Sequence, residues 1–106
     1  MKPANLFENI PGVLPDELLE QLAGNERVTI ERIVSHGHTT PEGEWFDQER
    51  DEWVMLLQGR ARLQFERDEN FVDMMSGDHI TIPAHLRHRV AWTDEEGDTI
   101  WLAVHF

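Results

Sequence analysis

The chain contains no cysteine among its 106 residues. This absence excludes disulfide bonds, thiolate zinc sites and a cysteine nucleophile. No apolar run approaches the ~20 residues that a membrane-spanning helix needs. The first residues also lack the long apolar region of a signal peptide. We therefore expect a cytoplasmic protein that has no membrane partner.

Basic side chains are scarce. Nine lysines and arginines stand against 21 aspartates and glutamates, and the formal net charge is −12. Such a surface repels the phosphate backbone of nucleic acids and the headgroups of anionic lipids. The charge therefore predicts that the protein does not bind nucleic acid.

The length of the chain fits one domain, which we place over residues 1–106. Prolines and a glycine punctuate residues 11–15, so the chain is expected to begin with an irregular arm. Residues 15–24 carry three leucines on one helical face and end on a glycine, which predicts a short helix. We assign the arm and the helix to residues 1–26 and a barrel to residues 27–106.

The remainder has the texture of short strands separated by turns. β-Branched residues in Val28–Ser35, an apolar run in Trp53–Leu57 and alternation in Arg60–Glu66 predict three strands. A polar turn is expected at Arg67–Asn70. Four further strands are predicted at Phe71–Met74, His79–Ile82, His88–Trp92 and Thr99–Phe106. Many short strands with regular turns indicate an all-β sandwich or barrel.

Two polar residues stand out because they occur where apolar side chains are expected. Glu52 opens an apolar strand, where an inward carboxylate without a partner would be costly. His88 shares strand parity with Val90 and Trp92, so its side chain should face the interior. An inward glutamate and an inward histidine need each other, a water network or a metal ion.

The spacing around these residues resembles the two motifs of the cupin superfamily. The first motif reads G-x5-H-x-H-x3 or 4-E-x6-G, and Glu52 and Gly59 match its end. The second reads G-x5-P-x-G-x2-H-x3-N, and Gly77, Pro83 and His88 match it. The resemblance runs from about residue 28 to the C-terminus. It implies a cupin-type β-barrel, a double-stranded β-helix or jelly roll like that of RmlC, and a homodimer.

The chain departs from the first motif, because both of its histidines are replaced. With a four-residue gap before Glu52 their positions hold Trp45 and Asp47, and with a three-residue gap they hold Phe46 and Gln48. The resemblance thus implies a metal site of Glu52, His88 and either Asp47 or Gln48. Such an oxygen-rich set suits manganese, iron, zinc or nickel without selecting among them.

Other side chains are candidates for the surroundings of this site. His38 and His85 are candidate general acids or bases. Trp45 and Trp92 stand at motif positions and are expected to line a pocket. His36, His79 and His105 are interpreted as structural histidines.

Two functions remain open from the sequence. One is a metal-dependent enzyme that acts on a small molecule by oxygenase, isomerase or lyase chemistry. The other is a non-catalytic module that binds or senses a small ligand without a tightly bound metal.

Overall fold

The computed structural model describes residues 1–67 and 70–106, and its regular elements are all strands. The first four are β1 (Leu18–Gly24), β2 (Thr29–Ser35), β3 (Glu52–Gln58) and β4 (Arg60–Phe65). The last four are β5 (Phe71–Met75), β6 (His79–Ile82), β7 (His88–Thr93) and β8 (Thr99–His105). The all-β class predicted from the sequence is confirmed. The turn predicted at Arg67–Asn70 includes residues 68 and 69, which lie outside the described residues.

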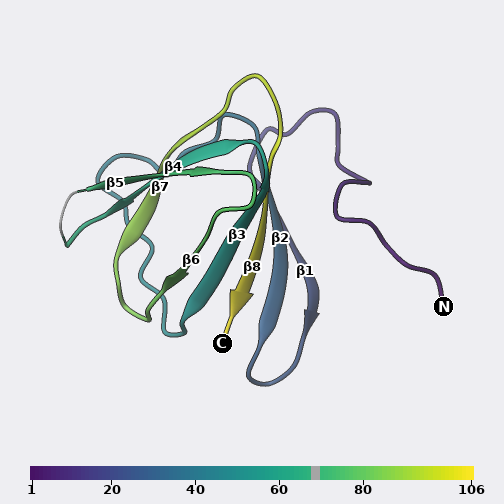
Figure 1. The fold of residues 1–106 in the computed structure, drawn as a ribbon, viewed down its shortest axis with the longest axis horizontal. Coiled ribbons are helices and arrows are strands. Elements are labelled where there is room, and N and C mark those ends of the chain that lie inside the picture. The colour runs from purple at the N-terminus through teal and green to yellow at the C-terminus, as the bar shows by residue number, and fades with distance from the viewer. Residues whose placement is uncertain (68–69) are drawn as a thin grey trace.

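The strands form two antiparallel sheets (Figure 1). The larger sheet has the order β1-β2-β8-β3-β6, and the smaller has the order β5-β4-β7. The C-terminal strand β8 lies between β2 and β3, so residues far apart in sequence become neighbours across it. This order matters for the site, because it brings the interior faces of β2, β8 and β3 side by side.

Alternation along the strands decides which side chains face the interior. In β4, Ala61, Leu63 and Phe65 are buried while Arg60 and Arg62 are exposed. Buried apolar residues from both sheets pack into one cluster among the described residues: Val54, Leu56, Ala61, Leu63, Phe65, Met74, Ile82, Trp101 and Ala103. Both sheets therefore turn their apolar faces toward one interior, as in a barrel.

The prediction of a short helix over residues 15–24 is wrong, because Leu18–Gly24 is strand β1. It pairs antiparallel with β2, from Leu18 opposite Val34 to Gly24 opposite Thr29. In this register Leu19 and Leu22 are 59% and 46% exposed, so the leucines do not form one buried stripe. Hydrogen bonds to β2 outweigh the local helical pattern, as tertiary context often does.

The N-terminal arm lies beside the large sheet, and its first residues extend away from the barrel (Figure 1). It is anchored by Arg32, which is 4% exposed. The Arg32 guanidinium donates hydrogen bonds to the carbonyl oxygens of Leu6, Glu8 and Asn9, and to the carboxylate of Glu20. These bonds satisfy a buried charge that would otherwise be costly.

Gly59 joins β3 to β4 and shows why the motif requires a glycine at this position. Its φ angle is +92°, and an added Cβ would lie 2.4 Å from the Thr99 hydroxyl oxygen and 2.7 Å from its Cα. Only glycine accepts both the left-handed backbone and this close approach.

Within the described residues, no helix is long and apolar enough to cross a membrane.

Candidate functional site

A short extended segment before β3 carries the residues that replace the motif histidines. The backbone of Phe46 pairs with that of His88, with N–O distances of 2.7 and 3.1 Å. Two residues later, the carbonyl oxygen of Gln48 accepts a hydrogen bond from the backbone of His85. Since successive side chains of an extended chain point to opposite sides, Phe46 and Gln48 face one way and Asp47 the other.

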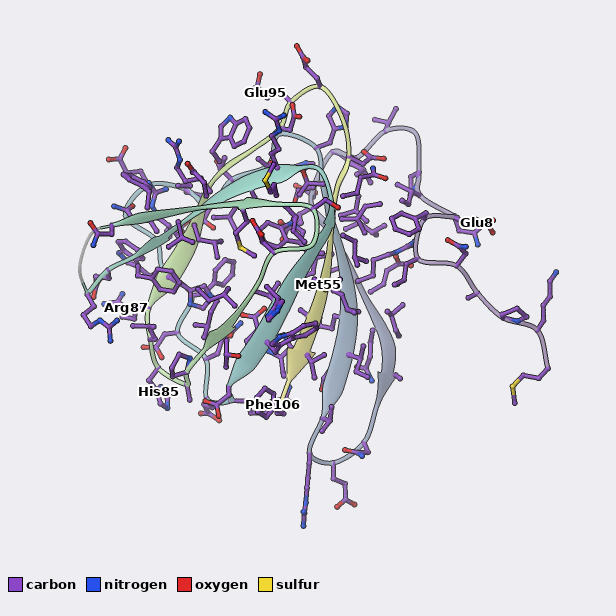
Figure 2. All side chains as sticks on the ribbon, viewed as in Figure 1. Glu8, Met55, His85, Arg87, Glu95 and Phe106 are labelled. Atoms are coloured by element: carbon purple, nitrogen blue, oxygen red, sulfur yellow. The ribbon has the colours of Figure 1, made fainter. Side chains whose placement is uncertain are left out.

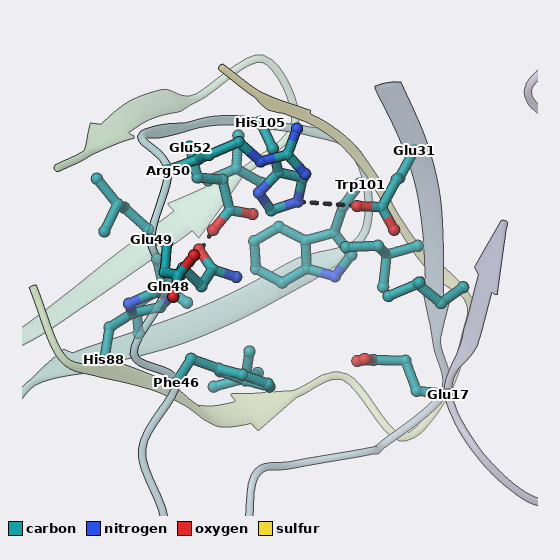
Figure 3. Close-up of a pocket in the computed structure, with 16 residues that line it drawn as sticks. Glu17, Glu31, Phe46, Gln48, Glu49, Arg50, Glu52, His88, Trp101 and His105 are labelled. Carbon is teal, nitrogen blue, oxygen red and sulfur yellow. Dashed lines mark ion pairs between the residues drawn. The ribbon is translucent and has the colours of Figure 1, made fainter. Parts of the chain in front are cut away.

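Between the two sheets lies a cavity of about 570 Å³, which we call the barrel cavity. This size lies within the range of small-molecule sites. Its lining mixes apolar walls with acidic and imidazole groups (Figure 3). The lining residues are Glu17, Leu19, Glu31, Ile33, Phe46, Gln48, Glu49, Arg50, Glu52, Val54, Leu63, Ile82, His88, Val90, Trp101 and His105.

Glu52 and His88 meet in this cavity, as their motif spacing predicts. Their exposed fractions are 7% and 5%, and the Nε2 of His88 lies 3.6 Å from the Glu52 Oε1. The Nδ1 of His88 lies 2.8 Å from the carbonyl oxygen of Leu86, which can only accept, so Nδ1 carries the proton. In neutral His88 the Nε2 lone pair is therefore directed to the cavity. Among the described residues, neither this Nε2 nor the Glu52 carboxylate makes a hydrogen bond, and we call them the open pair.

A second carboxylate–imidazole pair lines the same cavity. The Nε2 of His105 lies 2.9 Å from the Glu31 Oε1, and the two side chains are 11% and 13% exposed. His105 is the partner of Glu52 in the register of β8 with β3, so one member of each pair lies on these neighbouring strands. At hydrogen-bonding distance, Glu31 and His105 satisfy each other, and we call them the closed pair.

His85 and Asp47 form a third pair, which lies outside the barrel cavity. The Nδ1 of His85 lies 2.9 Å from the Asp47 Oδ1, and the side chains are 67% and 48% exposed. Figure 2 shows His85 projecting outward at the end of the barrel where Phe106 lies. His85 has a φ angle of +64°, which explains why the motif has glycine here.

The remaining predicted site residues also lie away from the barrel cavity. His38 and Trp45 line a second hollow of about 450 Å³. Both nitrogens of His38 have backbone partners: Nδ1 accepts from His36, and Nε2 donates to Leu14. Trp92 is 41% exposed and lines neither hollow. The structure thus brings Glu52, His88 and Gln48 together, but not Asp47, His38, His85, Trp45 or Trp92.

The lining of the barrel cavity is acidic. Four carboxylates, those of Glu17, Glu31, Glu49 and Glu52, face one guanidinium, that of Arg50. Within the described part of the chain, no three histidine, cysteine, aspartate or glutamate side chains gather closely enough to hold a metal ion. A cation at the open pair would therefore need a third donor of another kind, and Gln48 is the amide beside it.

Glu31, His105 and Trp101 line the cavity but are not among the site residues predicted from the sequence. A signal for two of them exists in strand parity. Glu31 shares a face with Ile33, and His105 shares a face with Trp101 and Ala103, opposite to Val104. A charged or imidazole side chain on the buried face of a strand is the pattern that identified Glu52 and His88.

Comparisons with known proteins agree with this geometry. The family model described as the cupin domain matches residues 30–105. No curated protein matches the chain. A solved structure from Ralstonia eutropha JMP134, named a "putative mannose-6-phosphate isomerase", is 46% identical with a TM-score of 0.94. The match covers 99% of this chain and 97% of that one.

Two more distant structures share the fold. A cupin superfamily protein from Desulfitobacterium hafniense DCB-2 is 22% identical, with a TM-score of 0.74 over 92% of this chain and 83% of that one. An RmlC-like cupin with a double-stranded β-helix fold from Methanocaldococcus jannaschii is 17% identical, with a TM-score of 0.69 over 92% and 85%. With the family model spanning most of the chain and the motif residues gathered in the barrel, this protein belongs to the cupin family.

Proposed function

We propose that the protein binds a small molecule in the barrel cavity, beside a divalent cation held by Glu52, His88 and Gln48. The observation that carries this proposal is the open pair. Both side chains are buried, their polar atoms face a cavity of ligand size at a separation longer than a hydrogen bond, and a donor or cation that enters the cavity can bind them.

The separation within the open pair supports a shared cation. Two ligands that each lie about 2.1 Å from one ion at a tetrahedral angle are about 3.4 Å apart. The 3.6 Å between His88 Nε2 and Glu52 Oε1 is close to this value and too long for a hydrogen bond. The hydrogen bond from His88 Nδ1 to Leu86 also fixes the ring in the tautomer that a metal ligand needs.

A cation held by three protein donors keeps open coordination positions. When bound, it would supply Lewis acidity to a carbonyl or hydroxyl oxygen of the ligand. Oxygenase, isomerase and lyase chemistry all remain compatible, and the name of the Ralstonia protein favours an isomerase. The acid or base role predicted for His38 and His85 stays a prediction, and their positions outside the barrel cavity do not support it.

The metal content of the purified protein tests the proposal. Untagged protein, purified without chelating resin, is analysed by inductively coupled plasma mass spectrometry and by thermal shift with manganese, iron, zinc and nickel. We expect bound metal or stabilisation by an added cation, and loss of both in Glu52→Gln and His88→Ala. His85→Ala is the matched control, because it removes an exposed histidine. Absence of metal and of any thermal shift in the unmodified protein would overturn the cation site.

A non-catalytic binding module is the second candidate. It is favoured by Phe46, which occupies a motif histidine position and lines the cavity with an apolar ring. With one imidazole in place of three, a cation would be held less tightly than in a complete site. This candidate predicts ligand-induced stabilisation that persists when cations are removed by EDTA.

The homodimer and the cytoplasmic location remain predictions from the sequence. The outer edge of β1 supports a dimer, because β1 pairs only with β2 and leaves one row of backbone groups unpaired among the described strands. Sedimentation equilibrium of the full chain measures the assembly directly. A monomer at micromolar concentration would contradict the prediction.

A further inference from the structure

The charge of the barrel cavity restricts what can enter it. Four carboxylates line it, and its one guanidinium, that of Arg50, donates a hydrogen bond to the Thr29 hydroxyl. Four carboxylates outnumber one guanidinium, so the net charge of the lining stays negative even if both imidazoles, those of His88 and His105, are protonated. It also stays negative if the imidazoles are neutral and a divalent cation occupies the open pair.

Two of the four carboxylates, those of Glu17 and Glu49, are exposed, whereas the other two do not lie on an ordinary solvated surface. Glu52 and Glu31 are largely buried against the apolar walls of the barrel, and Figure 3 shows Glu31 and Glu17 projecting from the side opposite His88 and Gln48. Low-dielectric walls lined by one sign of charge strengthen the field inside a cleft. A ligand between the two sides is therefore exposed to acceptors from both.

The Glu52 carboxylate points into the same cavity, where its one ion-pair partner among the described residues is His88 at 3.6 Å. It is 7% exposed, it faces the cavity, and it makes no hydrogen bond within the described residues. Glu17 retains acceptor capacity as well, since within the described residues it accepts one hydrogen bond, from the Ser35 hydroxyl at 2.9 Å. These acceptors match hydroxyl and ammonium donors and oppose a phosphate, which offers acceptors and negative charge.

We propose that the barrel cavity selects a hydroxylated small molecule without negative charge, and that an ammonium group on that molecule is favoured. Glu17 and Glu31 are the specificity-determining residues. The inference rests on the proposed ligand-binding role of the cavity but not on the cation. It implies that a phosphorylated sugar such as mannose 6-phosphate, which the name of the Ralstonia protein suggests, is a poor ligand for this chain.

Three probes with the same sugar ring and different charges test this selectivity. The ¹⁵N-labelled full chain is titrated with mannosamine, mannose and mannose 6-phosphate, with and without EDTA, and amide and indole shifts are followed by NMR. This method detects millimolar binding. We expect shifts at lining residues such as Trp101, with mannosamine at least about 10-fold tighter than mannose 6-phosphate.

Matched variants test which carboxylates cause the preference for mannosamine. Glu31→Gln should reduce the preference for mannosamine over mannose 6-phosphate several-fold, whereas Glu66→Gln, the same change outside the cavity at a pair with Arg87, should not. Glu17→Gln keeps the test available if Glu31→Gln fails to fold. Equal or tighter binding of mannose 6-phosphate, or no lining-residue shift with mannosamine, would overturn the inference. Cation binding, and its loss in Glu52→Gln, is measured in a separate experiment. A failure of the cation site can therefore be distinguished from a failure of the charge selectivity.

Discussion

The open pair and the closed pair contain the same two functional groups in one cavity, but only the closed pair is hydrogen-bonded. Glu31 and His105 lie at 2.9 Å and bond to each other, whereas Glu52 and His88 lie at 3.6 Å and do not. A closed pair compensates its own burial and needs no ligand. An open pair leaves polar atoms facing the cavity that a ligand can bind. The difference indicates that the two pairs contribute in opposite ways to stability and binding.

The largest expected effect concerns cation affinity. Glu52→Gln removes the carboxylate of the open pair and should lower the affinity for zinc or manganese by at least about 100-fold, because a direct ligand should cost no less than the roughly 10–100-fold that loss of an outer partner causes. Glu31→Gln removes the same charge from the closed pair and should lower it only a few-fold, through the weaker field. Competition with a fluorescent chelator measures both. Equal losses in the two variants would remove the distinction between the pairs.

In the absence of cations, we expect Glu31→Gln to affect stability more than Glu52→Gln. Glu31→Gln should lower the free energy of unfolding by about 1–3 kcal/mol, because it replaces a charged hydrogen bond to buried His105. Glu52→Gln should be neutral or stabilising, since it removes a buried charge that has no hydrogen bond. Urea denaturation in EDTA gives both values. If Glu52→Gln were the more destabilising variant, the open pair would be structural.

The pair of Asp47 and His85 is a solvent-exposed reference for the two pairs in the cavity. It has the same chemistry and nearly the same distance as the closed pair, but it lies in solvent. Asp47→Asn should change stability by less than about 0.5 kcal/mol, because solvent screens the interaction. Cation affinity should be unaffected. A large loss of affinity in this variant would instead favour the four-residue gap, in which Asp47 is the ligand.

The smallest effect is expected at Arg62 and Asp73, on the outer face of the small sheet. A hydrogen bond from the Arg62 guanidinium lowers the pKa of the Asp73 carboxyl. A lowered folded-state pKa contributes stability above the unfolded value that is lost as pH falls through the folded one. In Arg62→Gln, an NMR titration should show the pKa of Asp73 returning toward its ordinary range, with no change in ligand binding. A pKa that stays low would assign the shift to another group.

The sequence predicted best what depends on local pattern. The alternation in Arg60–Glu66 and the β-branched run in Val28–Ser35 predicted strands, which the structure contains over Arg60–Phe65 and Thr29–Ser35. Glu52 and His88 were found because each sits at a motif spacing and on an inward parity. These are properties that neighbouring residues reveal without knowledge of the strand order.

What the sequence did not predict depends on contacts between distant segments. Leu18–Gly24 is a strand because β2 lies beside it, although its leucines also suit a helix. The choice between Asp47 and Gln48 follows from the backbone bridge between Phe46 and His88. The closed pair requires β8 to lie next to β2, which no pattern within either strand specifies.

The most direct test of the central claim is a ¹⁵N NMR measurement on the histidine rings of the full chain, before and after zinc is added. We predict that His88 begins as the Nδ1-protonated tautomer and that its Nε2 resonance shifts on zinc binding. The resonances of His105 should stay unchanged, because that ring remains bound to Glu31. A zinc-dependent shift at His105 or His85 with none at His88, or no histidine shift at all, would contradict the central claim.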